Sequence, residues 1–493
     1  MGGHLPVLPI VLPLLAAPAC VLLRRRPVVL TFGIGVAWAT FALTVQLLLQ
    51  VLATGEPVTY ALGGWAAPYG IEYRIDVLSA FVALFVAGLG AVVLTYAPRS
   101  LAREVPADRQ YLFVTAYLLC MTGLLGISVT GDLFNVFVFL EISALASYQL
   151  IAMGPSRRAL TASFRYLVLG TIGATFILIG IGLLYEMTGT LNMVDVAHRI
   201  AEAKGTRTIR VASAFLAVGF GIKMALFPLH AWLPDAYAQA PSVVTAFLAA
   251  TATKVSVYVM LRFVYTVLGP ATSFQGSKLD WVLLPLALVA MFVASGVAIF
   301  QTNVRRMLAW SSLAQIGYMV LGISLANVTG VTAGIVHLFN HALTKGGLFL
   351  AMGCIAYRWG SVELRDLAGI GKRMPVTMFA WVIGGLGLIG VPATAGFVSK
   401  WYLVGAALER GMWPVAALIL LSSLLAVVYV WRVVEVAYFQ PAPEERGSVR
   451  EAPLSLLVPT CILLGTTLFF GLNAVWSAGV AEKAARVLMG GVP

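Results

Sequence analysis

Charged residues are scarce in this chain of 493 residues, at 11% of the sequence, whereas hydrophobic residues make up 60%. A soluble globular protein needs a larger charged surface, so the composition excludes that class and predicts a protein that crosses a membrane many times. The net charge of +12 does not by itself indicate a nucleic-acid-binding protein. Lysine and arginine also collect in the cytoplasmic loops of membrane proteins.

Cysteine is rare as well, and the few cysteines lie far apart, at Cys20, Cys120, Cys354 and Cys461. No CxxC or metal-ligand spacing is present, so we expect no disulfide framework, no metal site and no cofactor. The N-terminal segment has no basic residue before its first apolar run, which argues against a cleaved signal peptide. The segment "GLGLIG" at 385–390 matches a dinucleotide-binding pattern, but it lies in an apolar run with no strand before it.

The apolar residues fall into about fourteen runs that are long enough to span a bilayer. They lie near 5–23, 27–53, 76–97, 110–130, 132–153, 159–186, 209–230, 241–267, 280–302, 306–326, 329–357, 375–408, 412–437 and 453–475. This pattern predicts an all-α membrane protein with a single membrane domain over 1–493.

The predicted topology puts both ends of the chain on one side, because the number of spans is even. The loops on one side hold eighteen lysines and arginines, and those on the other side hold nine. The positive-inside rule therefore predicts that both termini lie on the non-cytoplasmic side of the inner (plasma) membrane.

Two of the predicted spans contain residues that interrupt helices. The segment 223–241 includes Pro228, Pro234 and Pro241, and the segment 385–403 includes Pro392 and several glycines. Proline removes a backbone donor, and the carbonyl groups that it frees need a polar cavity or other protein groups around them. Interrupted spans in the two halves of a chain are typical of inverted repeats with a central ion site.

Four lysines lie within predicted spans, at Lys223, Lys254, Lys345 and Lys400. A lysine at the centre of a membrane helix raises the free energy of insertion by about 2.5–3.5 kcal/mol, so each of the four is a candidate functional residue. Lys400 lies nearer the outer end of its span, and snorkelling toward the interface stays open as an alternative. Arg262 also lies near the end of a span, and we expect it to snorkel.

The segment "HLFNHALTKGGLFL" carries His337, His341 and Lys345 at a spacing of four residues. This spacing places the three side chains on one face of a helix, about 6 Å apart along its axis. One interpretation is structural, in which the three side chains only pack in the core and bond to nearby backbone groups. Zinc binding is disfavoured, because no third ligand is near. Histidine titrates near neutral pH, so we predict a proton relay.

Glu141 lies about 13 Å along its span from Asp132, close to the middle of the bilayer. A glutamate at this depth can bond to a nearby hydroxyl group or pair with a buried lysine. Lys223, Lys254, His341 and Lys345 are predicted at a similar depth, which indicates a polar line across the bundle in the membrane plane.

Four segments carry a resemblance to a known superfamily. They are "GDLFNVFVFLEI", "FPLHAWLPDAYAQAPSVVTAFLAATATKVSVY", "RRMLAWSSLAQIGYMVLG" and "HLFNHALTKGGLF". These segments resemble the antiporter-like proton-translocating subunits of respiratory complex I, of membrane-bound hydrogenases and of Mrp-type multisubunit Na⁺(K⁺)/H⁺ antiporters. The forms "GDLFN" and "PDAYAQAPS" are most similar to the D-type subunits of Mrp antiporters.

The resemblance implies two inverted five-helix repeats, at about 110–267 and 280–437, whose fourth helices are broken. It also implies roles for the buried residues. Glu141 and Lys223 form a coupling pair, Lys254 is the central lysine, and Lys400 lies at the outer exit. His337, His341 and Lys345 form the relay between the last two.

The function that the resemblance implies is proton translocation within a multisubunit antiporter for monovalent cations, Na⁺ or K⁺. The expected partners are other membrane subunits, not nucleic acid, and the chain itself is not expected to be an enzyme. The alternatives are a proton-pumping subunit of a complex I-like or hydrogenase-type redox complex, a scaffold that only binds partners, and a subunit for uptake of inorganic carbon. Four buried lysines argue against the scaffold.

Overall fold

The computed structural model describes residues 2–203, 206–442 and 449–490. Lys204 and Arg446, two of the charged residues counted in the topology prediction, lie outside these ranges. The elements of the first half are η1 (Gly2–His4), α1 (Leu8–Leu23), α2 (Arg26–Thr54), β1 (Val58–Ala61), η2 (Leu62–Gly64), β2 (Glu72–Ile75), α3 (Val77–Glu104), η3 (Ala107–Arg109), α4 (Gln110–Val129), α5 (Leu133–Ala152), α6 (Arg157–Thr188), α7 (Met193–Glu202), α8 (Arg207–Lys223), α9 (Leu233–Gln239), α10 (Ser242–Ala250), α11 (Ala252–Leu261) and η4 (Arg262–Val267).

The second half continues in the same helical manner. Its elements are η5 (Ala271–Gly276), α12 (Leu279–Ile299), α13 (Val304–Ser324), α14 (Val328–Trp359), η6 (Leu364–Leu367), α15 (Ile370–Arg373), α16 (Pro375–Ile389), α17 (Ala395–Glu409), α18 (Trp413–Phe439), α19 (Leu454–Leu472) and α20 (Ala474–Leu488).

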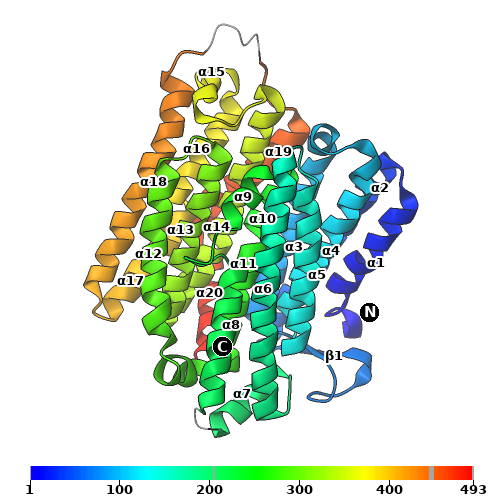
Figure 1. The fold of residues 1–493 in the computed structure, drawn as a ribbon, viewed down its shortest axis with the longest axis vertical. Coiled ribbons are helices and arrows are strands. Elements are labelled where there is room, and N and C mark those ends of the chain that lie inside the picture. Colours follow the sequence, from blue (N-terminus) through cyan, green and yellow to red (C-terminus); the bar gives the residue numbers. More distant parts are fainter. Residues whose placement is uncertain (1, 204–205, 443–448, 491–493) are drawn as a thin grey trace.

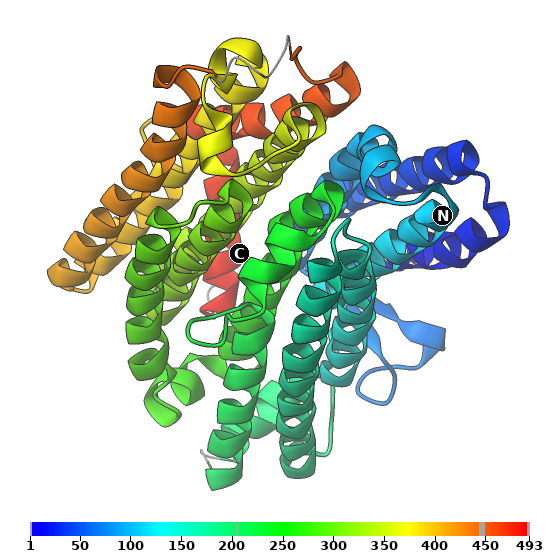
Figure 2. The ribbon, with the colours of Figure 1, turned by 45° about the horizontal axis from the view of Figure 1, so that its top comes forward.

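The long helices run side by side and form one bundle with two ends (Figure 1). We call the end that carries β1, β2 and α7 the hairpin face, and the end that carries η6 and α15 the opposite face. Helices α1 and α2 lie at one side of the bundle, and α17 and α18 lie at the other side (Figures 1 and 2). The bundle is thus elongated in the plane that a membrane would occupy.

Side-chain caps fix the points at which several long helices begin. Asp76 accepts a hydrogen bond from the Ser79 amide at 2.9 Å at the start of α3, and Asp132 accepts one from the Asn135 amide at 2.7 Å at the start of α5. Asn303 caps α13 in the same way. These caps satisfy backbone donors that have no partner within the helix. These three capping residues therefore mark the points at which the apolar helices begin.

The predicted spans agree with the helices of the structure, and each predicted run contains at least one helix. Within the described residues, ten helical segments are long and apolar enough to cross a membrane, and α1 and α16 are shorter apolar helices. The prediction of an all-α polytopic membrane protein is confirmed. His4 Nδ1 lies 2.9 Å from the Tyr60 hydroxyl oxygen of β1, and Met489 lines the same cavity as Arg74 of β2. Both ends of the described chain are therefore at the hairpin face.

Both predicted breaks are present. The seventh span ends at Lys223 and continues as α9 only at Leu233, and the twelfth span is divided into α16 and α17. These two helices approach so closely that a Cβ atom on Gly396 would lie 1.8 Å from the Gly387 carbonyl oxygen. A third break, which the sequence did not predict, lies at Thr251 between α10 and α11.

Three further elements were not predicted. Strands β1 and β2 pair as an antiparallel hairpin, with Val58 opposite Ile75. Helix α7 lies in the loop between the sixth and seventh predicted spans, and α20 occupies the segment after the last span. All three lie outside the apolar runs, which explains why a search for membrane spans did not find them.

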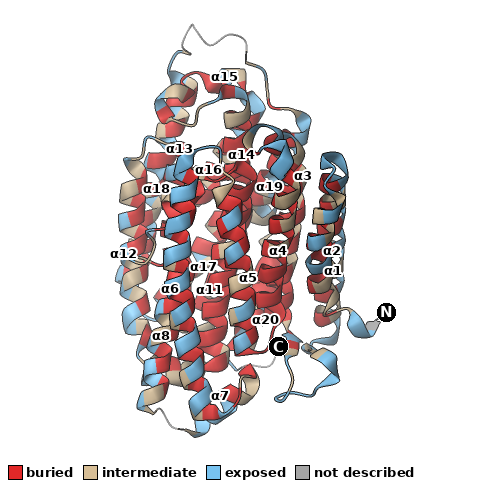
Figure 3. Cartoon of the chain, turned by 45° about the vertical axis from the view of Figure 1, so that its right-hand side comes forward, coloured by how far each residue is buried: buried red, intermediate tan, exposed pale blue. Residues whose placement is uncertain are grey.

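Two of the most deeply buried helices carry four of the candidate residues, which are Lys254 on α11 and His337, His341 and Lys345 on α14. Nearly every described residue of α11, α13 and α14 is buried, whereas α6 and α18 alternate between buried and exposed residues. Figure 3 shows this contrast as a red interior beneath outer helices that carry pale blue stripes. An amphipathic outer helix in a membrane protein turns its exposed stripe toward lipid or a partner. The interior helices therefore lie away from lipid within this chain.

Candidate functional site

Glu141 and Lys223 form an ion pair between α5 and the end of α8. The Lys223 Nζ atom donates a hydrogen bond to Glu141 Oε1 at 2.8 Å. The lysine side chain is 4% exposed and the glutamate side chain is 25% exposed. The break after Lys223 frees the Ile222 carbonyl group, which accepts a hydrogen bond from the Trp232 indole at 2.9 Å. The expected pair is present, and the break beside it is satisfied by protein groups.

A small cavity of about 20 Å³ lies between Lys223 and α11, and its wall includes Ser143, Ser147 and Ser256. A volume of about 10–15 Å³ is enough for one water molecule. The cavity is also lined by hydroxyl groups, which can hold a proton-carrying water. It therefore links the pair to the residues next to Lys254.

Lys254 is fully buried in α11, directly after the break at Thr251. Its Nζ atom donates hydrogen bonds to the Ala249 carbonyl and to the Thr253 hydroxyl. The lysine thus satisfies a carbonyl that the break leaves free. No direct bond joins Lys254 to Lys223 or Lys345 within the described residues.

Lys345 is fully buried in α14 and points to α13. Its Nζ atom donates a hydrogen bond to the Leu308 carbonyl at 2.7 Å and another to the Ser311 hydroxyl. No acidic side chain is paired with it among the described ion pairs. An ammonium group without a carboxylate partner is costly in a low-dielectric interior.

The two histidines lie on the same face of α14, as their spacing predicted. The rings of His337 and His341 are stacked, with centroids 5.9 Å apart and planes that differ by 3°. His337 Nδ1 lies 2.8 Å from the Ser399 hydroxyl oxygen. Within the described part of the chain, neither nitrogen of His341 has a hydrogen-bond partner. Buried polar atoms normally have a partner, so this place favours hydration.

Lys400 is 6% exposed and does not snorkel. Its Nζ atom donates hydrogen bonds to the Leu388 carbonyl at 2.9 Å and to the Ile389 carbonyl at 2.8 Å, at the end of α16. The same atom lies 4.8 Å from the centre of the Tyr318 ring. The snorkelling alternative is therefore wrong, because the broken helix offers the ammonium group a polar site inside the bundle.

The candidate residues form a line that runs through the interior from α5 to α17. Glu141 is bonded directly to Lys223. His337 contacts the His341 ring on one side and the Ser399 hydroxyl, next to Lys400, on the other. Ser311, Tyr318 and Ser399 were not among the predicted site residues. They are common residue types in helices, and only the fold shows that they contact the buried lysines and histidines.

Arg262 was expected to snorkel, and the structure contradicts this. The residue is only 9% exposed, and its guanidinium group forms an ion pair with Asp76. It also donates hydrogen bonds to the Ser79 hydroxyl at 2.8 Å and to the Tyr258 hydroxyl at 3.0 Å. The partner Asp76 lies far away in the sequence, so inspection of the span alone could not reveal it.

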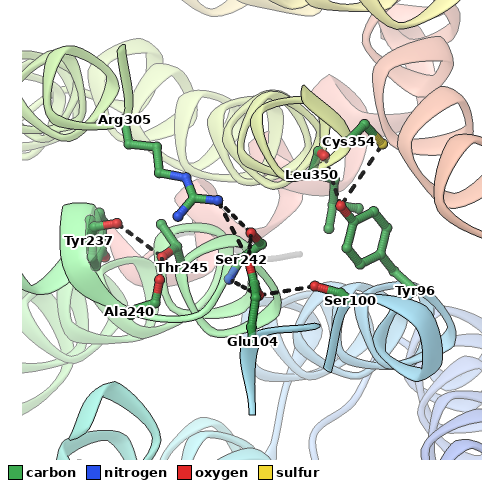
Figure 4. A network of polar contacts seen from close by, with 10 residues as sticks. All are labelled: Tyr96, Ser100, Glu104, Tyr237, Ala240, Ser242, Thr245, Arg305, Leu350 and Cys354. Atoms are coloured by element: carbon green, nitrogen blue, oxygen red, sulfur yellow. Dashed lines mark hydrogen bonds and ion pairs between the residues drawn. The ribbon is translucent and has the colours of Figure 1, made fainter. Parts of the chain in front are cut away.

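A second buried ionic cluster lies toward the opposite face (Figure 4). Glu104, at the end of α3, accepts hydrogen bonds from the amide and the hydroxyl of Ser242 at 2.8 and 2.5 Å. Arg305 of α13 donates to the same hydroxyl at 2.5 Å and lies 3.8 Å from Glu104. The carboxylate thus sits at the N-terminus of α10, where the helix dipole favours a negative charge. The cluster joins three helices that pack around the buried line.

The site contains no evident place for a metal. Within the residues that the structure describes, no group of three His, Cys, Asp or Glu side chains can hold a metal ion. The amines, imidazoles and carboxylate of the line can take part in proton transfer and electrostatic coupling.

A family model described as "NADH:quinone oxidoreductase/Mrp antiporter, TM" matches residues 130–426. This range contains every residue of the buried line, from Glu141 to Lys400. The chain belongs to this family.

Curated relatives within the family come from both kinds of complex. The chain is 44% identical to the N-type subunit of NADH-quinone oxidoreductase from Desulforudis audaxviator, over 94% of each chain. It is 31% identical to the D-type subunit of a Na(+)/H(+) antiporter from Bacillus subtilis, over 98% of this chain and 97% of the relative.

Solved structures show the same fold. A chain of the Mrp complex from Dietzia sp. matches with a TM-score of 0.90 at 27% identity, over 99% of this chain and 97% of that chain. A chain of an archaeal membrane-bound sulfane sulfur reductase matches with a TM-score of 0.91 at 32% identity, over 99% and 98%. A chain of respiratory complex I from Thermus thermophilus matches with a TM-score of 0.77 at 25% identity, over 96% and 99%.

Proposed function

We propose that this chain is the proton-translocating subunit of a multisubunit antiporter that exchanges a monovalent cation, Na⁺ or K⁺, for protons. The observation that carries the proposal is the series of ionisable groups, all buried except Glu141, that extends from the Glu141–Lys223 pair to Lys400. Four lysines buried in helices are costly, and such residues in membrane spans are usually retained for transport. A scaffold would gain nothing from them.

The proposed cycle is electrostatic. When Glu141 moves toward or away from Lys223, the stability of the charged lysine changes, because an opposite charge at 2.8 Å strongly favours the ammonium form. A proton then passes through hydroxyl-lined space to Lys254, continues past Lys345 and the histidines, and leaves at Lys400. Neighbouring positive charges repel each other. A proton that arrives at one position therefore disfavours a proton already held at the next position, and that second proton moves further along the line.

The exposure of Glu141 supports an assembly of several subunits. Glu141 lies on the same stripe of α5 as the exposed residues Phe134, Val138 and Leu145, at helical spacing. This stripe faces outward from the bundle, where a charged group in contact with lipid is strongly disfavoured. We therefore infer that a neighbouring subunit covers Glu141 and that the complete complex lies in the plasma membrane, with the hairpin face on the non-cytoplasmic side.

A second function is supported by the 44% identity to the N-type subunit of NADH-quinone oxidoreductase. In that case the chain would be a proton-pumping membrane subunit of a complex I-like enzyme and would hold no redox centre itself. We favour the antiporter because the forms "GDLFN" and "PDAYAQAPS" are most similar to the D-type subunits of Mrp antiporters. The TM-scores do not separate the two functions, since they are 0.90 for the Mrp chain and 0.91 for the chain of the archaeal respiratory complex. The same buried line would serve either complex.

The variant Glu141→Gln tests the proposal in everted vesicles that contain the assembled complex. We expect dye-monitored, cation-driven proton exchange to be abolished, while the amount of protein in the membrane stays normal. Glu186→Gln is the matched control, because Glu186 lies near the end of α6, away from the buried line, and it should remain active. Normal exchange by Glu141→Gln would remove this residue from the mechanism.

The two candidate functions differ in their driving force and their partners. The antiporter predicts proton movement when Na⁺ or K⁺ is added, and the chain expressed alone should insert without catalysing exchange. The redox complex predicts proton movement when an electron donor and a quinone are added, and iron–sulfur subunits should co-purify. Strong exchange by the purified single chain would contradict both candidates.

A further inference from the structure

A cavity of about 330 Å³ opens at the hairpin face and is not part of the line described above. Its rim includes the exposed residues Pro57 and Arg74 and the end of α20 at Met489. Its wall includes Asp76, Tyr258 and Arg262. The cavity therefore extends from the surface to a buried cluster of ionisable side chains.

The cluster at the wall of the cavity is fully bonded. Arg262 is held by Asp76, Ser79 and Tyr258 together, and the Tyr258 hydroxyl donates a hydrogen bond to the Ser128 carbonyl at 2.8 Å. A buried ion pair seldom adds net stability, because the desolvation of two charges offsets their attraction. Such a pair beside a solvent-accessible cavity, at the start of the π-helical segment η4, is a candidate for a functional element.

The cluster lies on the same helix face as the central lysine. Lys254, Tyr258 and Arg262 are spaced by four residues, as are His337, His341 and Lys345. Successive members of such a stripe lie about 6 Å apart along the helix axis. The backbone of Tyr258, the innermost polar residue of the cavity, is therefore one helical turn from that of Lys254. The Lys254 ammonium group is bonded on its other side, to the Ala249 carbonyl, so the side chain has to swing toward Tyr258 when it delivers a proton there.

We propose that the Asp76–Arg262 pair and Tyr258 form a gate between Lys254 and the hairpin-face cavity, so that protons reach this face from the first half of the chain without passing Lys400. The inference rests on the proposed function, because it requires Lys254 to carry a proton. It adds a second opening to the buried line, in a region where the proposed cycle has none.

The transfer involves only N–H and O–H bonds. Lys254 loses one proton from Nζ and becomes a neutral amine. The Asp76 carboxylate takes up a proton that is relayed through the hydroxyls of Tyr258 and Ser79, whose oxygen atoms lie 3.1 Å apart. Asp76 then releases the proton to solvent in the cavity. While Asp76 is neutral, its attraction for Arg262 is lost, so the pair separates only when a proton passes.

Other charged or titratable groups face this route as well. Arg74 reaches it from β2, and Tyr265 reaches it from η4. The Tyr265 hydroxyl donates a hydrogen bond to the Ile323 carbonyl at 2.6 Å, which fixes that side chain against α13. Arg74 and Arg262 both disfavour a second positive charge at the gate, so a proton that arrives there does not remain.

The test uses the assembled complex with single cysteine substitutions at the hairpin face. Thr266 lines the cavity and is partly exposed, whereas Gln275 is exposed on the same face and does not line it. Thr266→Cys and Gln275→Cys are treated with a membrane-impermeant trimethylammonium thiol reagent, in right-side-out and in everted vesicles. The Gln275→Cys variant reports which vesicles present the hairpin face, and the parent complex reports the effect of the reagent on its own cysteines. Asp76 is left intact, because it also caps α3.

We expect labelled Thr266→Cys to lose proton exchange by about tenfold or more, because a fixed positive charge would then block the cavity. Labelled Gln275→Cys should retain its activity. Full activity of labelled Thr266→Cys would overturn the gate, and so would a failure of Thr266→Cys to react where Gln275→Cys reacts. If Thr266→Cys does not assemble, Met489→Cys at the rim takes its place with the same expected outcomes.

The variant Glu141→Gln, measured in the same vesicles, separates this inference from the proposed function. If Glu141→Gln is inactive while labelled Thr266→Cys is fully active, the gate is refuted and the buried line stands. If Glu141→Gln is fully active, Glu141 is removed from the mechanism, and the result for labelled Thr266→Cys decides the gate alone.

Discussion

Lys345 provides the most stringent test of the buried line, because its ammonium group is fully buried and is bonded to a carbonyl and a hydroxyl of α13. The substitution Lys345→Met keeps most of the length of the side chain and removes its charge. We expect cation-driven proton exchange to fall by about tenfold or more, which corresponds to an added barrier of about 1.4 kcal/mol. The physical reason is the loss of a titratable position between Lys254 and His341.

The variant should remain stable enough to assemble. Removal of an ammonium group from the centre of a membrane helix recovers about 2.5–3.5 kcal/mol. The loss of two hydrogen bonds from a charged donor costs about 1.5–3 kcal/mol each. These terms cancel to within about 3 kcal/mol, so the variant should still assemble. A loss of exchange would then report on proton transfer and not on folding.

The assay is dye-monitored exchange across a range of pH, normalised to the amount of complex in the membrane. Lys345→Arg should not restore exchange, because arginine does not release its proton. Ser311→Ala is the matched control, since Lys345 keeps its bond to Leu308, and it should retain most of the activity. His337→Ala and His341→Ala should be milder, because water can bridge one helical turn. Full activity of Lys345→Met and of both histidine variants would refute the relay.

Three further predictions concern the breaks and the second ionic cluster. Gly396→Ala should lower the thermal stability of the purified complex, because its Cβ would collide with α16, whereas Gly405→Ala, with nothing within 4 Å, should not; equal stability of the two variants would contradict the close packing. Glu104→Ala should destabilise the complex by about 3–5 kcal/mol, as expected when one partner of a buried pair is removed, and denaturant titration measures this; an unchanged midpoint would count against the cluster. Lys400→Met should accelerate amide hydrogen exchange at residues 390–394, which mass spectrometry detects; unchanged exchange would show that the lysine does not hold the break.

The sequence allowed much of the fold to be predicted, since apolar runs and prolines report directly on spans and on two of the breaks. The break at Thr251 could not be predicted in this way, because no glycine or proline lies there and the interruption arises from packing within the bundle. The hairpin of β1 and β2 does contain glycines and alternating residues, but a search for long apolar runs passes over it.

The candidate site was predictable to the extent that its residues are ionisable and lie in apolar helices. The spacing of His337, His341 and Lys345 fixed their common face, and depth along the helices indicated that Glu141 lies level with Lys223. The partners of the lysines were not predictable, because most are backbone carbonyls. Arg262 was misjudged for a related reason, since its partner Asp76 belongs to a distant helix and the pairing depends on the tertiary fold.

The lysines at the breaks have a mechanical consequence. Lys400 holds two carbonyl groups at the end of α16, and Lys254 holds one beside Thr251. A charged donor forms hydrogen bonds about twice as strong as a neutral one. Each break is therefore latched while its lysine carries the proton and loosened when the proton has left. On the proposed function, the stiffness of the backbone at these points would follow the charge of the lysine, and the passage of a proton along the line would also be a sequence of local releases and closures in the helices themselves.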